Sequence, residues 1–140
     1  MIACDPSPTR RALALRLGAA EAVDAGDLPA GAADLAFEAV GAERTLADAL
    51  AATRRGGRVV LLGLGGTLAV DAFALVNNEQ SIIASVGYRD CHPELIRLAA
   101  TEGMDFTQIV TSIVPLADVV RDGFGTLLNT MEEIKVLVRP

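Results

Sequence analysis

The feature that most constrains the fold is an apolar run followed by glycines, Val59-Val60-Leu61-Leu62-Gly63-Leu64-Gly65-Gly66. The run is rich in β-branched side chains, which is typical of a strand covered on both faces in a parallel sheet. The glycines allow the backbone to turn sharply and let another group come close to it. A buried strand that ends in this way is where an open α/β sheet binds its ligand. We therefore predict a central strand at residues 58–62.

Strand-like and helix-like segments alternate along the whole chain. We predict strands at residues 1–4, 21–24, 34–40, 58–62, 81–86, 109–114 and 134–138, and helices at 8–17, 43–55, 71–77, 93–101 and 117–128. Ser7 and Pro8 suit the N-cap and the first position of the first helix. This alternation predicts an α/β fold with a parallel sheet and right-handed crossovers.

Composition and length exclude several classes of protein. The chain has 140 residues, of which 51% are hydrophobic, so it is long enough for one domain and too apolar to be disordered. A net charge of −6 argues against a general nucleic-acid or anionic-membrane surface. No secretory signal and no CxxC motif are evident, and His92 is the only histidine. We expect a soluble, cytoplasmic protein with two reduced cysteines and no metal site.

The glycines after the central strand nearly match the GxGxxG phosphate fingerprint. The sixth position, however, is Leu68, and the following Ala69-Val70-Asp71 does not open a helix. The fingerprint needs a helix N-terminus at this point, because the helix N–H groups hold the pyrophosphate. We therefore do not expect this loop to be the phosphate cradle.

Asp5 follows the first predicted strand and is a candidate ligand-binding residue. A carboxylate at the end of an early strand can accept both ribose hydroxyls of an adenosine cofactor and would repel a 2′-phosphate, so it would favour NAD over NADP. The alternative is that Asp5 is a strand-end turn residue before Pro6.

Three further residues, in two places, can each be interpreted in two ways. Glu38 lies inside a strand pattern, where an acid is unusual, and it marks either a cleft or a solvated face of the sheet. Tyr88 and Arg89 follow another strand end and either line a ligand crevice or lie in an exposed turn.

Four separated segments resemble the zinc-type alcohol and polyol dehydrogenases of the medium-chain family. They are residues 5–19, 37–41, 56–63 and 134–138, and their order and spacing match the family along essentially the whole chain. The resemblance implies a Rossmann-like, doubly wound and mostly parallel sheet that lacks its first, central strand. It implies a single partial dinucleotide-binding domain over residues 1–140, truncated at the N-terminus, with the catalytic zinc domain absent.

The resemblance also implies roles for individual residues, none of them catalytic or metal-binding. Asp5 would bind the adenosine ribose with Arg10 beside it, and Val40 and Gly41 would form the turn beside the adenosine half. Leu62, Gly63 and Leu64 would meet the nicotinamide carboxamide, with Ser85 and Val86 nearby. Lys135 would serve the pyrophosphate, unless it is an ordinary exposed lysine beside a strand. The strand Ser81 to Val86 would pair two sheets into a homodimer.

A missing central strand has a physical consequence. It leaves the strands at 1–4 and 35–40 without the neighbour between them, and each unpaired buried backbone group costs about 1–3 kcal/mol. We expect the chain alone to rearrange, to associate or to be marginally stable, because a whole domain is stable by only about 5–15 kcal/mol.

The resulting function hypothesis is the NAD-binding C-terminal part of a zinc-dependent alcohol or polyol dehydrogenase, inactive as an isolated chain. In the intact enzyme, hydride would pass between an alcohol and NAD. One alternative is a non-catalytic remnant used for dimerisation. Another is a methyltransferase-like domain that binds a nucleoside cofactor, S-adenosylmethionine (SAM). The strand, helix, strand pattern at residues 109–138 disfavours it, because such sheets usually finish with an antiparallel hairpin.

Overall fold

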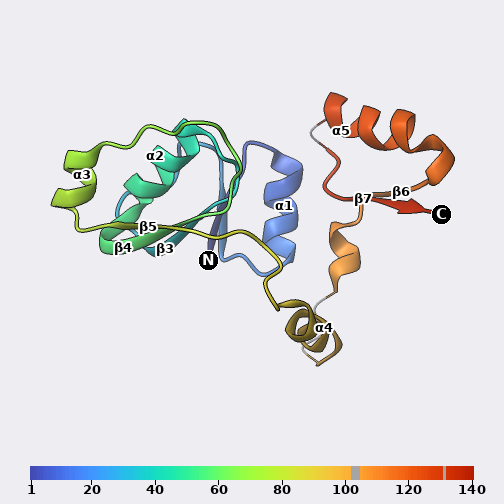
Figure 1. The fold of residues 1–140 in the computed structure, drawn as a ribbon, viewed down its shortest axis with the longest axis horizontal. Helices are drawn as coiled ribbons and strands as arrows, with labels where there is room; N and C mark the ends of the chain where they lie inside the picture. Colours follow the sequence, from blue (N-terminus) through green and yellow to red (C-terminus); the bar gives the residue numbers. More distant parts are fainter. Residues whose placement is uncertain (102–104, 131) are drawn as a thin grey trace. The chain divides into compact units, whose positions relative to one another are not determined.

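The computed structural model describes residues 1–101, 105–130 and 132–140. They form two compact units, which we describe separately (Figure 1). The continuous unit is Gly26–Arg89, and the split unit combines Met1–Ala25 with Asp90–Pro140. All the strand pairs found in the described ranges are parallel, as the alternation of strands and helices predicts. Within those ranges, no helix is long and apolar enough to cross a membrane.

The continuous unit is built on a three-stranded sheet in the order β3–β4–β5. The strands are β3, Ala33–Glu38, β4, Thr53–Leu61, and β5, Ser81–Ala84. Helix α2, Glu43–Ala52, lies along one face of this sheet, and the short helix α3, Ala72–Asn77, comes between β4 and β5 in the chain (Figure 1).

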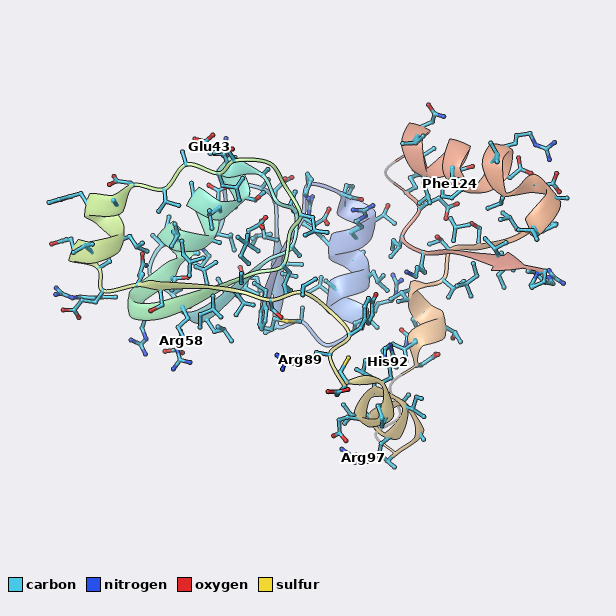
Figure 2. The ribbon with its side chains drawn as sticks, viewed as in Figure 1. Glu43, Arg58, Arg89, His92, Arg97 and Phe124 are labelled. Atoms are coloured by element: carbon cyan, nitrogen blue, oxygen red, sulfur yellow. The ribbon has the colours of Figure 1, made fainter. Side chains whose placement is uncertain are left out.

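The core of this unit lies between α2 and the central strand. Leu46 and Ala49 project from α2 onto Val59, which is completely buried on β4, and Ala36 and Ile82 pack beside them from β3 and β5. Arg58 alternates with Val59 and lies on the other side of the sheet from α2 (Figure 2). The predicted central strand is therefore confirmed, with its buried side chains facing the helix.

The end of α2 differs from the sequence expectation. The helix stops at Ala52, and Arg54 and Arg55 belong to β4 instead of the helix. The reason is distant in sequence, because the side-chain amide of Gln80 donates to the carbonyl oxygens of Leu50 and Thr53 at 3.0 and 2.7 Å. These bonds satisfy carbonyls that would otherwise continue the helix ladder.

The split unit contains two separate two-stranded sheets. The first pairs β1, Ile2–Cys4, with β2, Glu21–Val23, and the second pairs β6, Ser112–Pro115, with β7, Val136–Arg139. Its helical segments are α1, Pro8–Arg16, α4, His92–Thr101, the 3-10 turns η1, Phe106–Ile109, and η2, Leu116–Asp118, the π-helix η3, Val119–Phe124, and α5, Gly125–Asn129.

The predicted helix at residues 117–128 is irregular. It begins as a 3-10 turn, widens into the π-helix η3 and ends as the short helix α5. Gly123 and Gly125 lie inside it, and glycine weakens the regular α-helix. Gly123 is buried close to Val119 and Val114, whereas the neighbouring Phe124 is exposed.

The strand pairs agree with the two flanks of a Rossmann sheet. In the order 3-2-1-4-5-6, the pair β2–β1 corresponds to strands 3 and 2, and β3–β4–β5 corresponds to strands 4, 5 and 6. Among the described residues, no strand pairs with both β1 and β3. In this order the strand β4 takes the fifth position.

Candidate functional site

Asp5 lies directly after β1 in a loop held by several hydrogen bonds. Its carboxylate oxygen Oδ1 accepts from the backbone N–H of Ser7 at 2.8 Å, and its other oxygen, Oδ2, lies 3.9 Å from Arg10 Nη1. Ser7 is buried and caps α1 by accepting from the N–H of Arg10 at 3.4 Å. The predicted helix start is confirmed, and it fixes the aspartate at the end of the strand.

A second arginine closes the same loop. Arg11 Nη1 donates to the carbonyl oxygens of Asp5 and Pro6 at 2.8 and 3.0 Å and pairs with Asp24 at 3.1 Å. These contacts join the loop after β1 to the residue after β2. The carboxylate of Asp5 is therefore presented by a supported loop.

Arg10 has an unused donor beside Asp5. Its Nη2 donates to the carbonyl oxygen of Glu133 at 3.1 Å, but its Nε is buried and has no hydrogen-bond partner among the described residues. Oδ2 of Asp5, with only the 3.9 Å ion pair, retains lone pairs that can accept hydrogen bonds. A group that offers hydroxyl donors, such as a ribose, fits this carboxylate oxygen.

In the continuous unit, Glu38 organises the carboxyl end of β3. Its Oε1 accepts from the N–H groups of Val40 and Gly41 at 2.9 and 2.8 Å and from the hydroxyl of Thr45 at 2.6 Å. Its backbone carbonyl accepts from the N–H groups of Leu62 and Gly63 at 2.7 and 3.0 Å. Glu38 is 2% exposed, so neither a cleft nor a solvated face explains this acid.

Burial and hydrogen bonding act on Glu38 in opposite directions. Burial alone would raise the pKa of its carboxyl group. The hydroxyl of Thr45 and the N–H groups of Gly41, Val40 and Gly63 outweigh that effect and hold the pKa of Glu38 below its usual value. The carboxylate is therefore ionised at neutral pH.

The glycine loop after β4 packs against the turn after β3. A Cβ atom on Gly65 would lie 1.8 Å from the carbonyl oxygen of Gly41, and Gly41 itself has a φ of +84°. The helix that follows, α3, begins only at Ala72. These glycines permit a close approach of two backbones, which agrees with the expectation that this loop is not a phosphate cradle.

The other predicted positions of the continuous unit lie on the exposed ends of its strands. Val40, Leu62 and Leu64 are exposed, and Leu64 is 91% exposed. Ser85 continues the ladder of β5 by donating its N–H to the carbonyl oxygen of Leu61 at 3.1 Å, and Val86 beyond it is 82% exposed. Together they place apolar side chains at the carboxyl ends of three neighbouring strands.

The predicted residues fall into the two units. Asp5, Arg10 and Lys135 belong to the split unit, where Lys135 is exposed and its carbonyl oxygen accepts from the N–H of Thr111 at 2.9 Å. Val40, Gly41, Leu62, Gly63, Leu64, Ser85 and Val86 belong to the continuous unit.

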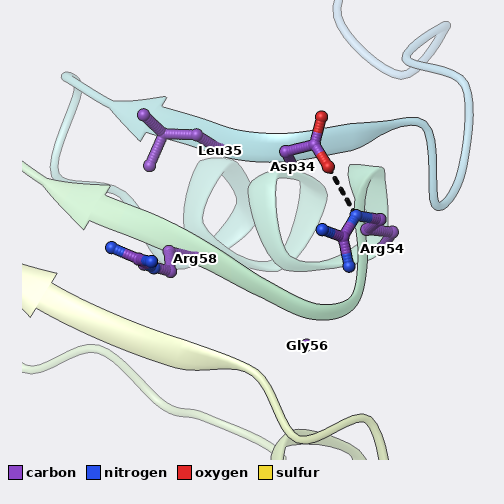
Figure 3. A pocket seen from close by; sticks show the side chains of 5 residues that line it. All are labelled: Asp34, Leu35, Arg54, Gly56 and Arg58. Carbon is purple, nitrogen blue, oxygen red and sulfur yellow. Dashed lines mark hydrogen bonds and ion pairs between the residues drawn. The ribbon is translucent and has the colours of Figure 1, made fainter.

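A hollow lies at the opposite end of these strands, where β3 and β4 begin. A cavity of about 300 Å³ is lined by Asp34, Leu35, Arg54, Gly56 and Arg58 at the amino ends of β3 and β4 (Figure 3). Asp34 and Arg54 form an ion pair of 2.5 Å across it. Open α/β sheets bind ligands at the carboxyl ends of their strands, so this hollow is not the candidate site.

Comparison with known families decides the relationship. The sequence profile described as zinc-binding dehydrogenase matches residues 1–101. The chain belongs to the zinc-binding dehydrogenase family. It is homologous to the NAD-binding domain of zinc-dependent alcohol and polyol dehydrogenases, as the resemblance of its four segments implies.

Several zinc-binding dehydrogenases are similar to this chain. It is 30% identical over 111 residues to (R,R)-butanediol dehydrogenase from Bacillus subtilis (strain 168), which covers 79% of the chain and 32% of that protein. The crystal structure of 2R,3R-butanediol dehydrogenase from Bacillus subtilis superposes with a TM-score of 0.87 at 29% identity, covering 99% of the chain and 43% of that structure. A zinc-binding dehydrogenase from Sinorhizobium meliloti 1021, bound to NADP, superposes with a TM-score of 0.85 at 25% identity, covering 99% and 44%.

The chain therefore spans about a third of the length of the curated relative it matches. In the part of this chain that the structure describes, no group of three or more His, Cys, Asp or Glu residues is placed to hold a metal ion. The described residues do not fit the zinc of the family name.

Sequence reasoning missed the residues that support the site. Thr45 and Arg11 carry no signal in their immediate neighbourhood, because each acts on a group several residues away. A usable signal was the acid at the end of β3 followed by Gly41, since a glycine there indicates a turn whose N–H groups an acid can accept from.

Proposed function

We propose that this chain binds NAD as the dinucleotide-binding part of a zinc-dependent alcohol or polyol dehydrogenase. The observation that carries the proposal is Asp5, held at the end of β1 with one carboxylate oxygen available. Family membership and the NADP bound by the neighbour from Sinorhizobium meliloti support a nicotinamide dinucleotide as the ligand.

The charge of Asp5 determines which dinucleotide is preferred. Its free oxygen would accept from the adenosine ribose hydroxyls, with the positively charged Arg10 beside it. A 2′-phosphate would bring a second negative charge against the carboxylate. We therefore propose NAD over NADP.

The family resemblance also assigns cofactor contacts to residues of the continuous unit. The turn at Val40 and Gly41 would lie beside the adenosine half, and the strand end at Leu62, Gly63 and Leu64 would meet the nicotinamide carboxamide through its backbone. Ser85 and Val86 would lie beside these residues. By the same resemblance, Lys135 of the split unit would bind the pyrophosphate. The exposed apolar side chains at these strand ends support this assignment, since dinucleotide rings bind between apolar groups.

Hydride transfer between an alcohol and NAD would take place only in the intact enzyme. NAD, when bound, supplies a hydride acceptor, and this chain's residues would orient it and keep water from its rings. We propose that the zinc ligands lie outside the residues described here, because those residues offer no cluster for the metal. We further propose a cytoplasmic location, where the thiols of Cys4 and Cys91 would stay reduced.

A second candidate function is dimerisation through the edge of the β3–β4–β5 sheet. β5 pairs with β4 on one side, and in the described residues no strand pairs with its other side. Such an edge can receive another strand, so a second copy could extend the sheet. In the intact enzyme this edge would form a homodimer, and in a non-catalytic remnant it would be the whole function.

Titration with NADH, followed by its fluorescence, tests the proposal. We expect saturable binding to the wild-type chain, weaker binding of NADPH, and about a tenfold loss of NADH affinity for Asp5→Asn with a smaller difference between the two cofactors, since one charge-assisted hydrogen bond contributes roughly 1.5–3 kcal/mol. Asp48→Asn is the matched control, because Asp48 is also paired with an arginine, Arg44, and is not among the proposed cofactor contacts. A wild-type chain that does not bind NADH, but sediments as a dimer, would support the second candidate instead.

A further inference from the structure

We propose that Glu38 is a positioning residue of the dinucleotide site, holding the turn after β3 and the end of β4 in one fixed arrangement. The inference rests on the proposed function and extends it to a residue that does not itself touch the cofactor.

Five donor groups converge on this one residue. The carboxylate accepts from Val40, Gly41 and Thr45, and the backbone carbonyl accepts from Leu62 and Gly63. Thr45 lies in the first turn of α2, so Glu38 joins three segments that are separate in sequence. The positions proposed for the cofactor at the ends of β3 and β4 thus depend on the same side chain and its backbone.

The chemistry requires an ionised carboxylate. All the side-chain bonds of Glu38 come from donors, and Gly41 N–H also lies 3.1 Å from the second oxygen, Oε2. A carboxylate only accepts hydrogen bonds, so both oxygens suit this surrounding. A glutamine would turn an NH₂ group toward the N–H of Gly41 or toward Val40 and Thr45, and either orientation sets donor against donor.

The turn after β3 is ordered although its neighbouring side chains are exposed, which indicates a role in binding at the surface. Val40 is exposed and Leu64, on the loop that packs against the turn, is also exposed, so neither contributes to the core. A buried charge is costly, and burying apolar side chains would stabilise this corner without that cost. A buried carboxylate that orders exposed backbone is what a preformed binding surface needs, because ordering it in advance reduces the entropy lost on binding.

Two measurements on Glu38→Gln test the inference, with Leu46→Ala as the matched control. Leu46 is buried in α2 and contacts Val59. Its truncation therefore destabilises the unit without removing a hydrogen bond to Glu38 in the turn after β3. Hydrogen exchange by NMR reports the turn without any ligand. We expect the N–H groups of Val40 and Gly41 to lose protection in Glu38→Gln relative to the N–H of Val59, and to keep their relative protection in Leu46→Ala.

NADH titration provides the second readout. At a temperature where Glu38→Gln is folded, we expect it to bind NADH about tenfold more weakly than the wild type. Removing a residue that supports a metal ligand typically weakens metal binding by about 10–100-fold, and we take the lower end of that range as a guide. We expect Leu46→Ala to bind NADH as the wild type does. If Glu38→Gln does not fold, Thr45→Val removes one donor while leaving the carboxylate, and a smaller loss of the same kind is expected.

The outcomes separate the two proposals. Unchanged exchange and unchanged NADH affinity in Glu38→Gln, with a wild type that binds NADH, would overturn the positioning role and leave the proposed function standing. Equal losses of affinity in Glu38→Gln and Leu46→Ala would show that stability alone is responsible and would also overturn it. A wild type that shows no saturable binding of NADH would overturn the proposed function and, with it, the role of Glu38 in that site.

Discussion

A Cβ atom placed on Gly63 would lie 2.0 Å from the backbone nitrogen of Gly41. No side chain fits at that distance, so the loop after β4 and the turn after β3 are in backbone contact. The same atom would lie 2.6 Å from Oε2 of Glu38, so both neighbours would have to shift to admit it. The contact explains why the loop is rich in glycine although it is followed by no helix N-terminus for a phosphate.

Gly63→Ala should therefore destabilise the chain. We expect a loss of about 1–3 kcal/mol, the range for forcing extra methyl groups into a packed region. Urea unfolding followed by circular dichroism measures it. Gly66→Ala is the control, because a Cβ there meets nothing within 4 Å, and its effect should stay within about 0.5 kcal/mol. Equal effects at the two positions would contradict the contact.

The ionised state of Glu38 makes stability depend on pH. The pKa of Glu38 in the folded chain is below the ordinary value of 4.5, so its contribution is fully present above that value and is lost as the pH falls through the folded-state pKa. We expect the difference in urea midpoint between wild type and Glu38→Gln to be constant near neutral pH and to shrink on acidification below pH 4.5. Exposed carboxylates such as Asp34 also have lowered pKa values, but they are common to both proteins and cancel in the difference. A difference that does not vary with pH would contradict the assignment.

Ser7→Ala should weaken the start of α1. The hydroxyl of Ser7 accepts from the N–H of Arg10 at 3.4 Å, and loss of such a cap typically costs about 0.5–2 kcal/mol. The long distance favours the lower part of that range. Thr9→Ala, at an exposed position of the same helix, is the comparison. Thermal unfolding of the variants measures both, and a Ser7→Ala chain as stable as Thr9→Ala would show that the cap contributes nothing.

Leu46→Ala should cost about 2–5 kcal/mol, because the leucine is 2% exposed and packs on the fully buried Val59. Leu50→Ala, at the partly buried edge of the same cluster, should cost less. Guanidinium unfolding at one temperature ranks them. A larger loss at Leu50 would mean that the core is centred elsewhere than on Val59.

The sequence predicted those parts of the fold that depend on neighbouring residues. Ser7 and Pro8 start α1 through local capping, and the apolar run around Val59 forms the central strand. The end of α2 could not be predicted, because it depends on Gln80, which lies 27 residues from Thr53. Gly123 of the π-helix η3 likewise lies close to Val114 of β6, a contact that the sequence pattern does not reveal.

The candidate site was predicted from family resemblance more than from local pattern. Asp5 could be proposed from its place after a strand, but its bond to Ser7 and its closeness to Arg10 required coordinates. For Glu38 the sequence left two alternatives open, and both were wrong. Its role depends on Leu62 and Gly63, which come close only when β3 and β4 pair in their observed register.

The convergence on Glu38 restricts how this protein can be recombined with its relatives. The turn after β3, the first turn of α2 and the end of β4 share one acceptor residue, and two of their backbones touch. A chimaera that exchanges the β3 turn alone would bring a foreign turn to an unchanged β4 loop. Segments 38–45 and 62–65 should therefore be transplanted as one module, and natural variation in either should be accompanied by variation in the other.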